Sequence, residues 1–407
     1  MATRTTSWAG LLLMLLAFVG CASSRHYSSL DLGLLPCEMG PPVFGAPEPF
    51  FHPLEFTAEG KPAFPEQVEY LKSRLSQPSP RLYDLVFFVH GWNKSPFSAE
   101  ADYQNFLCRL HARLRVVIAD EKAHDGLVVV GIFWPSTIAN SDRESPILTP
   151  WSYYRMRNRA DRIAEGGLAA LFAELIPILQ KLKPTEMPLP QLGENNLPIS
   201  QRPYRGARLQ LIGHSFGGRM LVRSLATLSK RDKLVPFLLA SASANVVLLN
   251  AAVPAANFDW IASAIRANIS SGTPARLTEA TSSYLFNIHS FNDGANRVLF
   301  PLASTFDDDA VGCAAGACGV PDYATICIDD HGSIRETGLL NPAAASNPTA
   351  RVNVWNVDAT EIVFSHTDIY KGRVAHLLPD LIYGPLRSRF PANRSGLASP
   401  AERCTQK

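Results

Sequence analysis

The sequence predicts an α/β protein built on a doubly wound, mostly parallel sheet with helices on both faces. Short runs of consecutive apolar residues recur along the chain, as expected of parallel strands that are buried on both sides. Amphipathic segments separate several of these runs, so that strand and helix alternate in the order that gives parallel crossovers. At 407 residues the chain is long enough for one large domain of this kind.

Each expected element follows from a local pattern. The first strand, LVFFVH at 85–90, is a continuous apolar run up to His90, and the pair Ser95-Pro96 after it marks a helix start, because proline suits the first helical turn. Apolar residues from 103 to 117 recur at helical spacing and complete this helix. Later strands are expected at 127–133, 207–213, 245–253, 283–291 and 351–357. Later helices are expected at about 158–182, 219–228 and 257–268.

The overall composition is that of a globular protein. Hydrophobic residues make up 46% of the chain and charged residues 18%, and 38 basic against 36 acidic residues give a formal net charge of +2. Because the positive excess is small and unclustered, a nucleic-acid partner is not expected.

The N-terminus carries a targeting segment. Arg4 precedes a twelve-residue apolar run, Trp8 to Val19, which is shorter than a bilayer span and suits a signal sequence. The run ends in FVGCASS, which resembles a bacterial lipoprotein signal, and the resemblance implies lipidation of Cys21. The presence of Ala22 directly after Cys21 resembles the pattern of lipoproteins that are sent to the outer membrane. The expected location is therefore the cell envelope, facing the periplasm. Cleavage without lipid, giving a secreted protein, and an uncleaved anchor are the alternatives.

Pattern and composition divide the chain into a few parts. The main domain is expected to follow a Pro-rich arm with little periodicity and to contain a Cys-rich insert. The parts are a signal peptide at 1–21, the arm at 22–82, the domain at 83–390, the insert at about 304–350 and a polar tail at 391–407.

Six cysteines remain when Cys21 is set aside, and an even number in an exported protein favours disulfides without fixing their pairing. Three of them lie in CAAGACGVPDYATIC, where at least one bridge is expected. A zinc site made by these three and His331 is the alternative. Cys108 lies on the apolar face of the first helix and is expected to be a buried thiol.

The stretch LQLIGHSFGGRM holds the strongest signal for chemistry. An apolar strand runs into a turn with Ser215 at its tip, and a helix leaves at once. This is the context of a nucleophile elbow, in which a strained serine needs small neighbours such as Gly213 and Gly217. The alternative is a phosphate-binding loop, but the chain has neither G-x-x-x-x-G-K-[ST] nor G-x-G-x-x-G.

An activated serine needs two donors for the developing oxyanion. In the stretch FFVHGWNKS, Gly91 and Trp92 directly follow the first strand, so the main-chain N–H groups of Trp92 and Phe216 are the expected pair. A tight turn with a buried aromatic residue is the alternative. His90 is expected to orient this loop and not to act as a base.

The serine also needs a base and an acid, which follow it in chain order in such folds. Of the four later histidines, His366 in VFSHTDIY lies in a polar loop after a strand and is the expected base. Asp293 in NIHSFNDGANR, in a turn after a strand, is the expected acid, with Asp259 as the alternative. The remaining groups fit less well: His289 lies within a strand, His376 resembles a packed core histidine, His331 is in the insert, and Asp307, Asp308 and Asp309 resemble a solvated loop.

The motifs VFFVHGWN, GIFWPS, LIGHSFGGR, HSFND and SHTD together resemble the α/β-hydrolase superfamily, over roughly residues 83 to 385. Their order is similar to a bacterial group with HGFN, WPS and GHSMGGR motifs. An acidic residue that this group carries after the strand matching NVVLLN is replaced here by AAVPAANFD. The resemblance implies an ester, thioester or amide hydrolase that works through an acyl-enzyme, with no metal and no cofactor.

The expected function is therefore a serine esterase or lipase-like hydrolase acting on a small-molecule or lipid ester. An acyltransferase with the same triad is the second enzymatic reading, and an envelope lipoprotein that uses the fold as a binding scaffold is the third. Segments 135–157, 184–205 and 304–350 are candidates for pocket walls or a lid. The sequence leaves the oligomeric state open.

Overall fold

The computed structural model describes most of the expected domain. The described residues are 33–34, 50–77, 82–117, 124–137, 149–182, 185–186, 204–234, 237, 244–254, 257–258, 260–261, 263, 284–293, 295, 324–328, 334–335, 354–370 and 372–383. The targeting segment with Cys21, most of the insert at about 304–350, the tail at 391–407, His331, Asp259 and Asp307 to Asp309 lie outside them.

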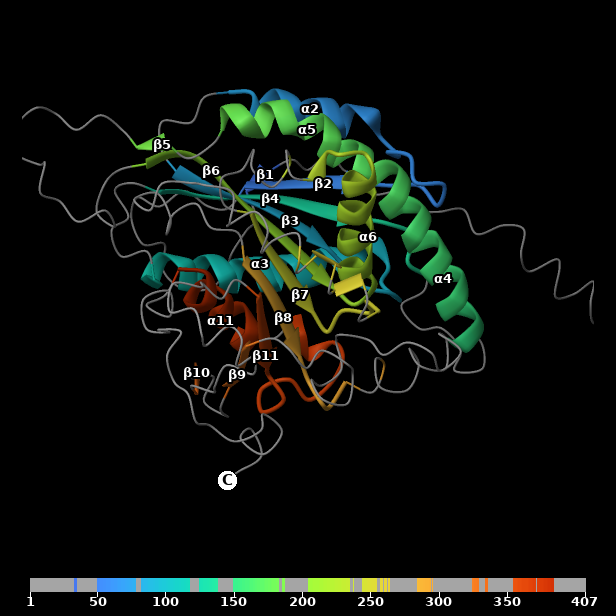
Figure 1. Cartoon of the computed structure of the whole chain (residues 1–407), viewed down its shortest axis with the longest axis vertical. Helices are drawn as coiled ribbons and strands as arrows, with labels where there is room; N and C mark the ends of the chain where they lie inside the picture. Colours follow the sequence, from blue (N-terminus) through green and yellow to red (C-terminus); the bar gives the residue numbers. More distant parts are fainter. Residues whose placement is uncertain are drawn as a thin grey trace, which may run out of the picture.

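The described strands form one 11-stranded sheet, in the order β1-β2-β4-β3-β6-β7-β8-β11-β9-β10, with β5 paired to β6 (Figure 1). All neighbouring strands from β2 to β9 along this order are parallel, and β1, β5 and β10 are antiparallel additions. The strands are β1 (Gly33–Leu34), β2 (Phe50–Glu55), β3 (Leu82–Val89), β4 (His124–Phe133), β5 (Thr185–Glu186), β6 (Tyr204–His214), β7 (Ala244–Leu249), β8 (Tyr284–His289), β9 (Ala324–Ile328), β10 (Ile334–Arg335) and β11 (Val354–Asp358).

Helices cover both faces of the sheet, which confirms the predicted α/β class with a parallel sheet (Figure 1). Helices α3 and α11 pack together on one face, and α4, α5 and α6 lie on the other, where α2 packs on α5. The helical elements are α2 (Pro65–Leu75), α3 (Pro96–Val117), α4 (Thr149–Ile163), the π-helical turn η2 (Ala164–Leu168), α5 (Ala169–Lys181), α6 (Phe216–Lys230), the 3₁₀ turn η5 (Asp368–Tyr370) and α11 (Gly372–Tyr383).

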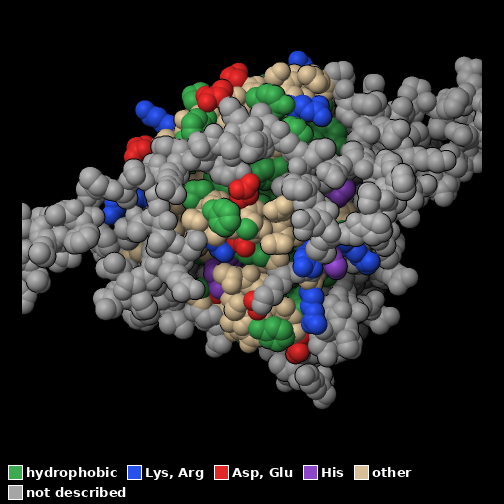
Figure 2. Space-filling view, turned by 180° about the vertical axis from the view of Figure 1, so that it is seen from behind, with side chains coloured by type: hydrophobic (Ala, Val, Ile, Leu, Met, Phe, Trp, Pro, Cys, Tyr) green, Lys and Arg blue, Asp and Glu red, His purple; other side chains and the backbone are tan. Residues whose placement is uncertain are grey.

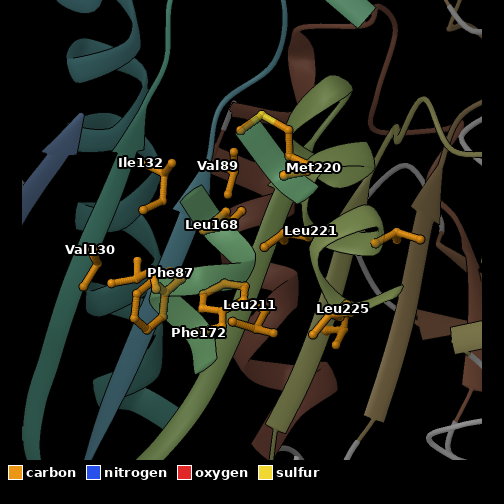
Figure 3. Close-up of a cluster of buried hydrophobic side chains, with 14 of the residues drawn as sticks. Phe87, Val89, Val130, Ile132, Leu168, Phe172, Leu211, Met220, Leu221 and Leu225 are labelled. Atoms are coloured by element: carbon orange, nitrogen blue, oxygen red, sulfur yellow. The ribbon is translucent and has the colours of Figure 1, made fainter. Parts of the chain in front are cut away.

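Alternating side chains of β3 enter two separate cores. Phe87 and Val89 join the core beneath α5 and α6, whereas Val86 and Phe88 join the one beneath α3 and α11. Figure 3 shows the first core, where side chains of β3, β4 and β6 meet those of α5 and α6. Because successive residues of a strand point to opposite faces, a wholly apolar run is what a sheet with helices on both sides requires.

Three described elements, β1, β2 and α2, precede the expected domain start and were not predicted. Strand β2 pairs in parallel with β4, and helix α2 follows it. The side chain of Gln67 on α2 accepts a hydrogen bond from the Glu55 N–H of β2 at 3.0 Å, and the Gln67 carbonyl lies 2.8 Å from His52 Nε2. The sequence did not predict this strand, because the region is rich in proline and has little periodicity. Pairing with β4 stabilises the strand.

Three local expectations were wrong. The helix expected from residue 158 begins at Thr149 and contains a π-helical turn. His376, expected in the core, is exposed on α11, because the buried stripe of that helix runs through Val374, Ala375, Leu377 and Leu378. Cys108 is buried as expected but is disulfide-bonded and not a free thiol.

The π-helical turn permits a close approach between two backbone segments. A Cβ atom at Gly167 would overlap the carbonyl oxygen of Gly60, whereas one at Gly166 would lie 3.9 Å from the same oxygen. Gly60 itself has a φ of +83°, which a side chain would strain. The Gly-Gly pair in AEGGL therefore has one position that must be glycine and one that need not be.

Within the described residues one helical stretch, Ser152–Lys181, is long and apolar enough to cross a membrane by length and composition. Its residues Met156, Leu168, Phe172 and Leu175 are buried in the core under the sheet, as in a core helix of a globular domain. On the face seen in Figure 2, described side chains of both charge signs are interspersed with hydrophobic and uncharged ones.

Candidate active site

Ser215 occupies a strained turn between β6 and α6. Its φ of 53° and ψ of −121° lie in a region that non-glycine residues rarely adopt. The Ser215 N–H is bonded to the Leu249 carbonyl at the end of β7, at 3.0 Å, and the residue is 4% exposed. The turn holds the serine at the N-terminus of α6, where free N–H groups and the helix dipole favour negative charge.

The glycines of GHSFGG are required by the packing of this turn. A Cβ atom at Gly217 would overlap the carbonyl oxygen of Val89 at the end of β3. One at Gly213 would lie 2.6 Å from the Cα atom of Gly218. Helix α6 can therefore approach the ends of β3 and β6 only because these positions lack side chains.

The loop after β3 lies directly against the serine. A Cβ atom at Gly91 would lie 2.9 Å from Ser215 Cβ and 2.7 Å from His214 Nδ1. Gly91, the residue before Trp92, therefore lies in contact with the turn that holds Ser215. Within the described residues, neither the Trp92 N–H nor the Phe216 N–H makes a hydrogen bond, so both amides remain able to bind a substrate oxygen.

The segments HGWN and FWPS hold each other in place. The indole N–H of Trp134 donates to the His90 carbonyl at 3.0 Å, and the two rings stack. Ser136 accepts bonds from the Asn93 N–H at its carbonyl and from the Lys94 N–H at its hydroxyl, both at 3.0 Å. These bonds fix Asn93 at a φ of 60° and set the course of the loop that presents Trp92.

His90 has the structural role that its sequence position suggested. Its Nδ1 lies 2.8 Å from the Gly91 carbonyl, and its Nε2 accepts a hydrogen bond from the main-chain N–H of Trp134 at 3.4 Å. Burial lowers the pKa of His90 to about 3, so the ring is neutral. A neutral ring that uses both nitrogens in loop contacts cannot also serve as a base.

His366 and Asp293 form a close pair. His366 Nδ1 lies 2.8 Å and 2.9 Å from the two carboxylate oxygens of Asp293, which is fully buried. Because a carboxylate only accepts, Nδ1 carries the proton and Nε2 of the neutral ring is left as a base. The His366 side chain is 20% exposed. The expected acid and base are therefore brought together, while Asp259 lies outside the described residues.

Several bonds join the loops that carry this pair. The Ser290 hydroxyl donates to the Val363 carbonyl at 2.6 Å, and the Phe291 N–H donates to the Thr360 hydroxyl at 2.9 Å. The Asn292 side chain also donates to the Thr360 carbonyl at 3.2 Å. The loop after β8 is thereby held against the loop after β11.

Ser215 and His366 are linked through His214. The His214 and His366 rings are 4.7 Å apart between centroids, and His214 Nε2 lies 2.9 Å from the His366 carbonyl. No hydrogen bond joins Ser215 Oγ to His366 among the described residues, which is common before substrate binds. Sequence reasoning missed His214 and its partner Tyr370, because a contact across 156 residues leaves no local signal.

An aromatic cluster lies beside the elbow. Tyr153 of α4 packs on Phe216 with ring centroids 4.8 Å apart and on Trp92 at 5.5 Å. Neither the Tyr153 hydroxyl nor the Trp92 indole N–H has a hydrogen-bond partner among the described residues. Tyr153 lies in the segment at 135–157 that was a candidate for a pocket wall.

Within the described part of the chain, no group of three or more His, Cys, Asp or Glu side chains could hold a metal ion. No protein-family model matches the sequence, and a search of curated proteins finds no relative.

Proposed function

We propose that this protein is a serine hydrolase of the α/β-hydrolase type that cleaves carboxylic or lipid esters through an acyl-enzyme. Ser215 would be the nucleophile, His366 the base, Asp293 the acid that orients it, and the Trp92 and Phe216 N–H groups the oxyanion donors. The observation that carries this proposal is the buried Asp293 carboxylate 2.8 Å from His366 Nδ1, with the His366 main chain bonded to the residue next to the strained Ser215.

The strand order supports the same assignment. Ser215 follows β6, Asp293 follows β8 and His366 follows β11, and these three strands run in parallel with only β7 between β6 and β8. The carboxyl ends of parallel strands meet at one edge of a sheet, where α/β enzymes bind their substrates. The order Ser, Asp, His along the chain is also that of this fold family.

In the first half of the proposed reaction, Ser215 Oγ attacks the ester carbonyl carbon while its proton passes to His366 Nε2. The carbonyl electron pair moves to the oxygen, which the two amides stabilise. Collapse of the tetrahedral intermediate breaks the bond to the alcohol, which leaves with the proton from His366. Asp293 remains ionised and stabilises the imidazolium.

In the second half, water attacks the acyl-enzyme and gives its proton to His366. Collapse returns the proton to Ser215 Oγ and releases the carboxylic acid. An acyltransferase would differ only in using an alcohol or amine in place of water at this step. Product analysis with added alcohol or amine acceptors therefore separates the two reactions.

The test is labelling of the purified mature protein with a fluorophosphonate probe, with the modified residue identified by mass spectrometry. Stoichiometric labelling at Ser215 is expected, with loss of labelling in Ser215→Ala and His366→Ala. Ser229→Ala, at the far end of the same helix, and His376→Ala, an exposed histidine, serve as matched controls that should label normally. A folded protein that does not label, even with detergent or lipid, would instead favour the scaffold reading.

The proposal includes an envelope location through a lipid on Cys21. In a bacterial host, Cys21→Ala should move the protein from the membrane fraction to the soluble fraction without changing fluorophosphonate labelling. An unchanged membrane fraction would argue for an uncleaved anchor.

A further inference from the structure

His214 is hydrogen-bonded through both ring nitrogens. Its Nε2 lies 2.9 Å from the His366 carbonyl oxygen, and its Nδ1 lies 2.8 Å from the Tyr370 hydroxyl. Because a carbonyl oxygen only accepts, Nε2 must carry the proton. Nδ1 of the neutral ring is then an acceptor, and the Tyr370 hydroxyl must donate to it.

The loop that holds Trp92 lies against His214, because a Cβ atom at Gly91 would lie 2.7 Å from His214 Nδ1. The two bonds of His214 point the same way, from the Tyr370 hydroxyl through the ring to the His366 carbonyl. Bonds aligned in this manner polarise and strengthen one another in a buried environment.

The side chains of this series are packed so that they cannot rotate freely. The His214 ring meets Tyr370 at 4.8 Å between centroids, and it is 1% exposed. The Tyr370 ring packs on Phe88 at 6.1 Å and on Phe106 at 6.4 Å, and Lys94 Nζ lies 5.4 Å from its centre.

The charge of the His214 ring affects the proposed base, because His214 lies beside His366. Burial, followed by the proximity of His366, holds the pKa of His214 well below its usual value, and Lys94 and His90 act in the same direction. Asp293 pairs with His366 and also acts on Tyr153, and Asp102 acts on Tyr370. A neutral His214 keeps its acceptor for Tyr370 and does not repel an imidazolium at His366.

We infer that His214 and Tyr370 are positioning residues that fix the His366 main chain relative to Ser215 and couple it to the Gly91-Trp92 loop. This inference rests on the proposed function. The base, the nucleophile and one oxyanion donor lie on three loops. The Tyr370-His214-His366 series joins the first two loops, because His214 is next to Ser215, and it lies against Gly91 of the third loop.

The experiment measures the rate of fluorophosphonate labelling at Ser215 in the full mature protein. Tyr370→Phe removes one hydroxyl and keeps the ring, and we expect labelling about tenfold slower, the effect of losing one buried hydrogen bond. His214→Phe removes the donor to the His366 carbonyl and should react at least as slowly. His214→Gln keeps an N–H donor and should recover labelling to within about threefold of the wild type. Tyr83→Phe, a buried tyrosine at the start of β3, is the matched control and should react normally.

The outcomes separate the two proposals. A wild-type protein that is not labelled at Ser215 overturns the proposed function and this inference with it. A labelled wild type whose Tyr370→Phe and His214→Phe variants react equally fast overturns the inference alone. Labelling rates that follow only the melting temperature, with no recovery in His214→Gln, also overturn it, because they indicate a purely structural role.

Discussion

The carboxylate of Asp293 is fully buried and holds His366 Nδ1 at 2.8 Å and 2.9 Å from its two oxygens. The two residues are 73 positions apart and lie on the loops after β8 and β11. A buried carboxylate paired with a partly exposed imidazole fixes the tautomer of the ring and leaves Nε2 free to accept a proton.

Asp293→Asn should therefore leave the fold intact and remove most of the esterase activity that we propose. The asparagine amide has one oxygen that can accept from Nδ1–H, whereas its NH2 group can only donate. The ring therefore loses its fixed tautomer and the stabilisation of its charged form. We expect a fall of about 10³- to 10⁴-fold in the rate of activated-ester hydrolysis. Asp232→Asn, at an exposed position after α6, is the control and should keep full activity. Equal rates in both variants would remove Asp293 from the triad.

Stability should fall as the pH drops below neutral. Burial lowers the pKa of His90 from 6.5 to about 3 and that of His52 from 6.5 to about 4. Between pH 6.5 and pH 4 the unfolded chain therefore binds protons at these positions that the folded chain does not. Each such group reduces the unfolding free energy by about 1.4 kcal/mol per pH unit in this window.

Urea denaturation at several pH values measures this effect. In His52→Gln, whose amide can still donate to the Gln67 carbonyl, the slope below pH 6.5 should be shallower by about one proton. An unchanged slope would mean that His52 does not remain neutral in the folded protein.

The two glycines of the π-helical turn should respond oppositely to alanine. Gly167→Ala forces a methyl group into the Gly60 carbonyl and should lower the unfolding free energy by about 2 kcal/mol or more. Gly166→Ala meets the same oxygen only at 3.9 Å, and it should be neutral or stabilising by up to about 1 kcal/mol. Chemical denaturation of the two variants side by side tests this pair, and equal losses would contradict the close approach at Gly167.

Two buried tyrosines differ in whether their hydroxyls are satisfied. The Tyr103 hydroxyl donates to the Ile132 carbonyl at 2.7 Å and accepts the His90 N–H at 2.9 Å, so Tyr103→Phe should cost about 1–3 kcal/mol. The Tyr153 hydroxyl has no partner among the described residues, so Tyr153→Phe should raise the melting temperature. If Tyr153→Phe also raises KM for ester substrates, the hydroxyl binds substrate. A fall in melting temperature would mean that the hydroxyl is already satisfied.

Local residue patterns are sufficient to predict the α/β class and the position of the turn that holds Ser215. Apolar runs such as LVFFV predict strands buried on both faces, because alternate side chains must enter two cores, and β3 does so. The glycines around Ser215 predict the sharp turn, because a side chain at Gly213 or Gly217 would collide with neighbouring backbone. These features are local, so the pattern of residues within a few positions is sufficient to predict them.

Which distant residues meet depends on the three-dimensional fold. Strand β2 pairs with β4, the Trp134 indole N–H donates to the His90 carbonyl, and the Tyr370 hydroxyl is bonded to His214. None of these contacts was predicted. Asp293 also pairs with His366, although the sequence identified each of these residues only separately. Such contacts depend on strand order and on the hydrogen bonds between loops, and neither leaves a periodic signal in the chain.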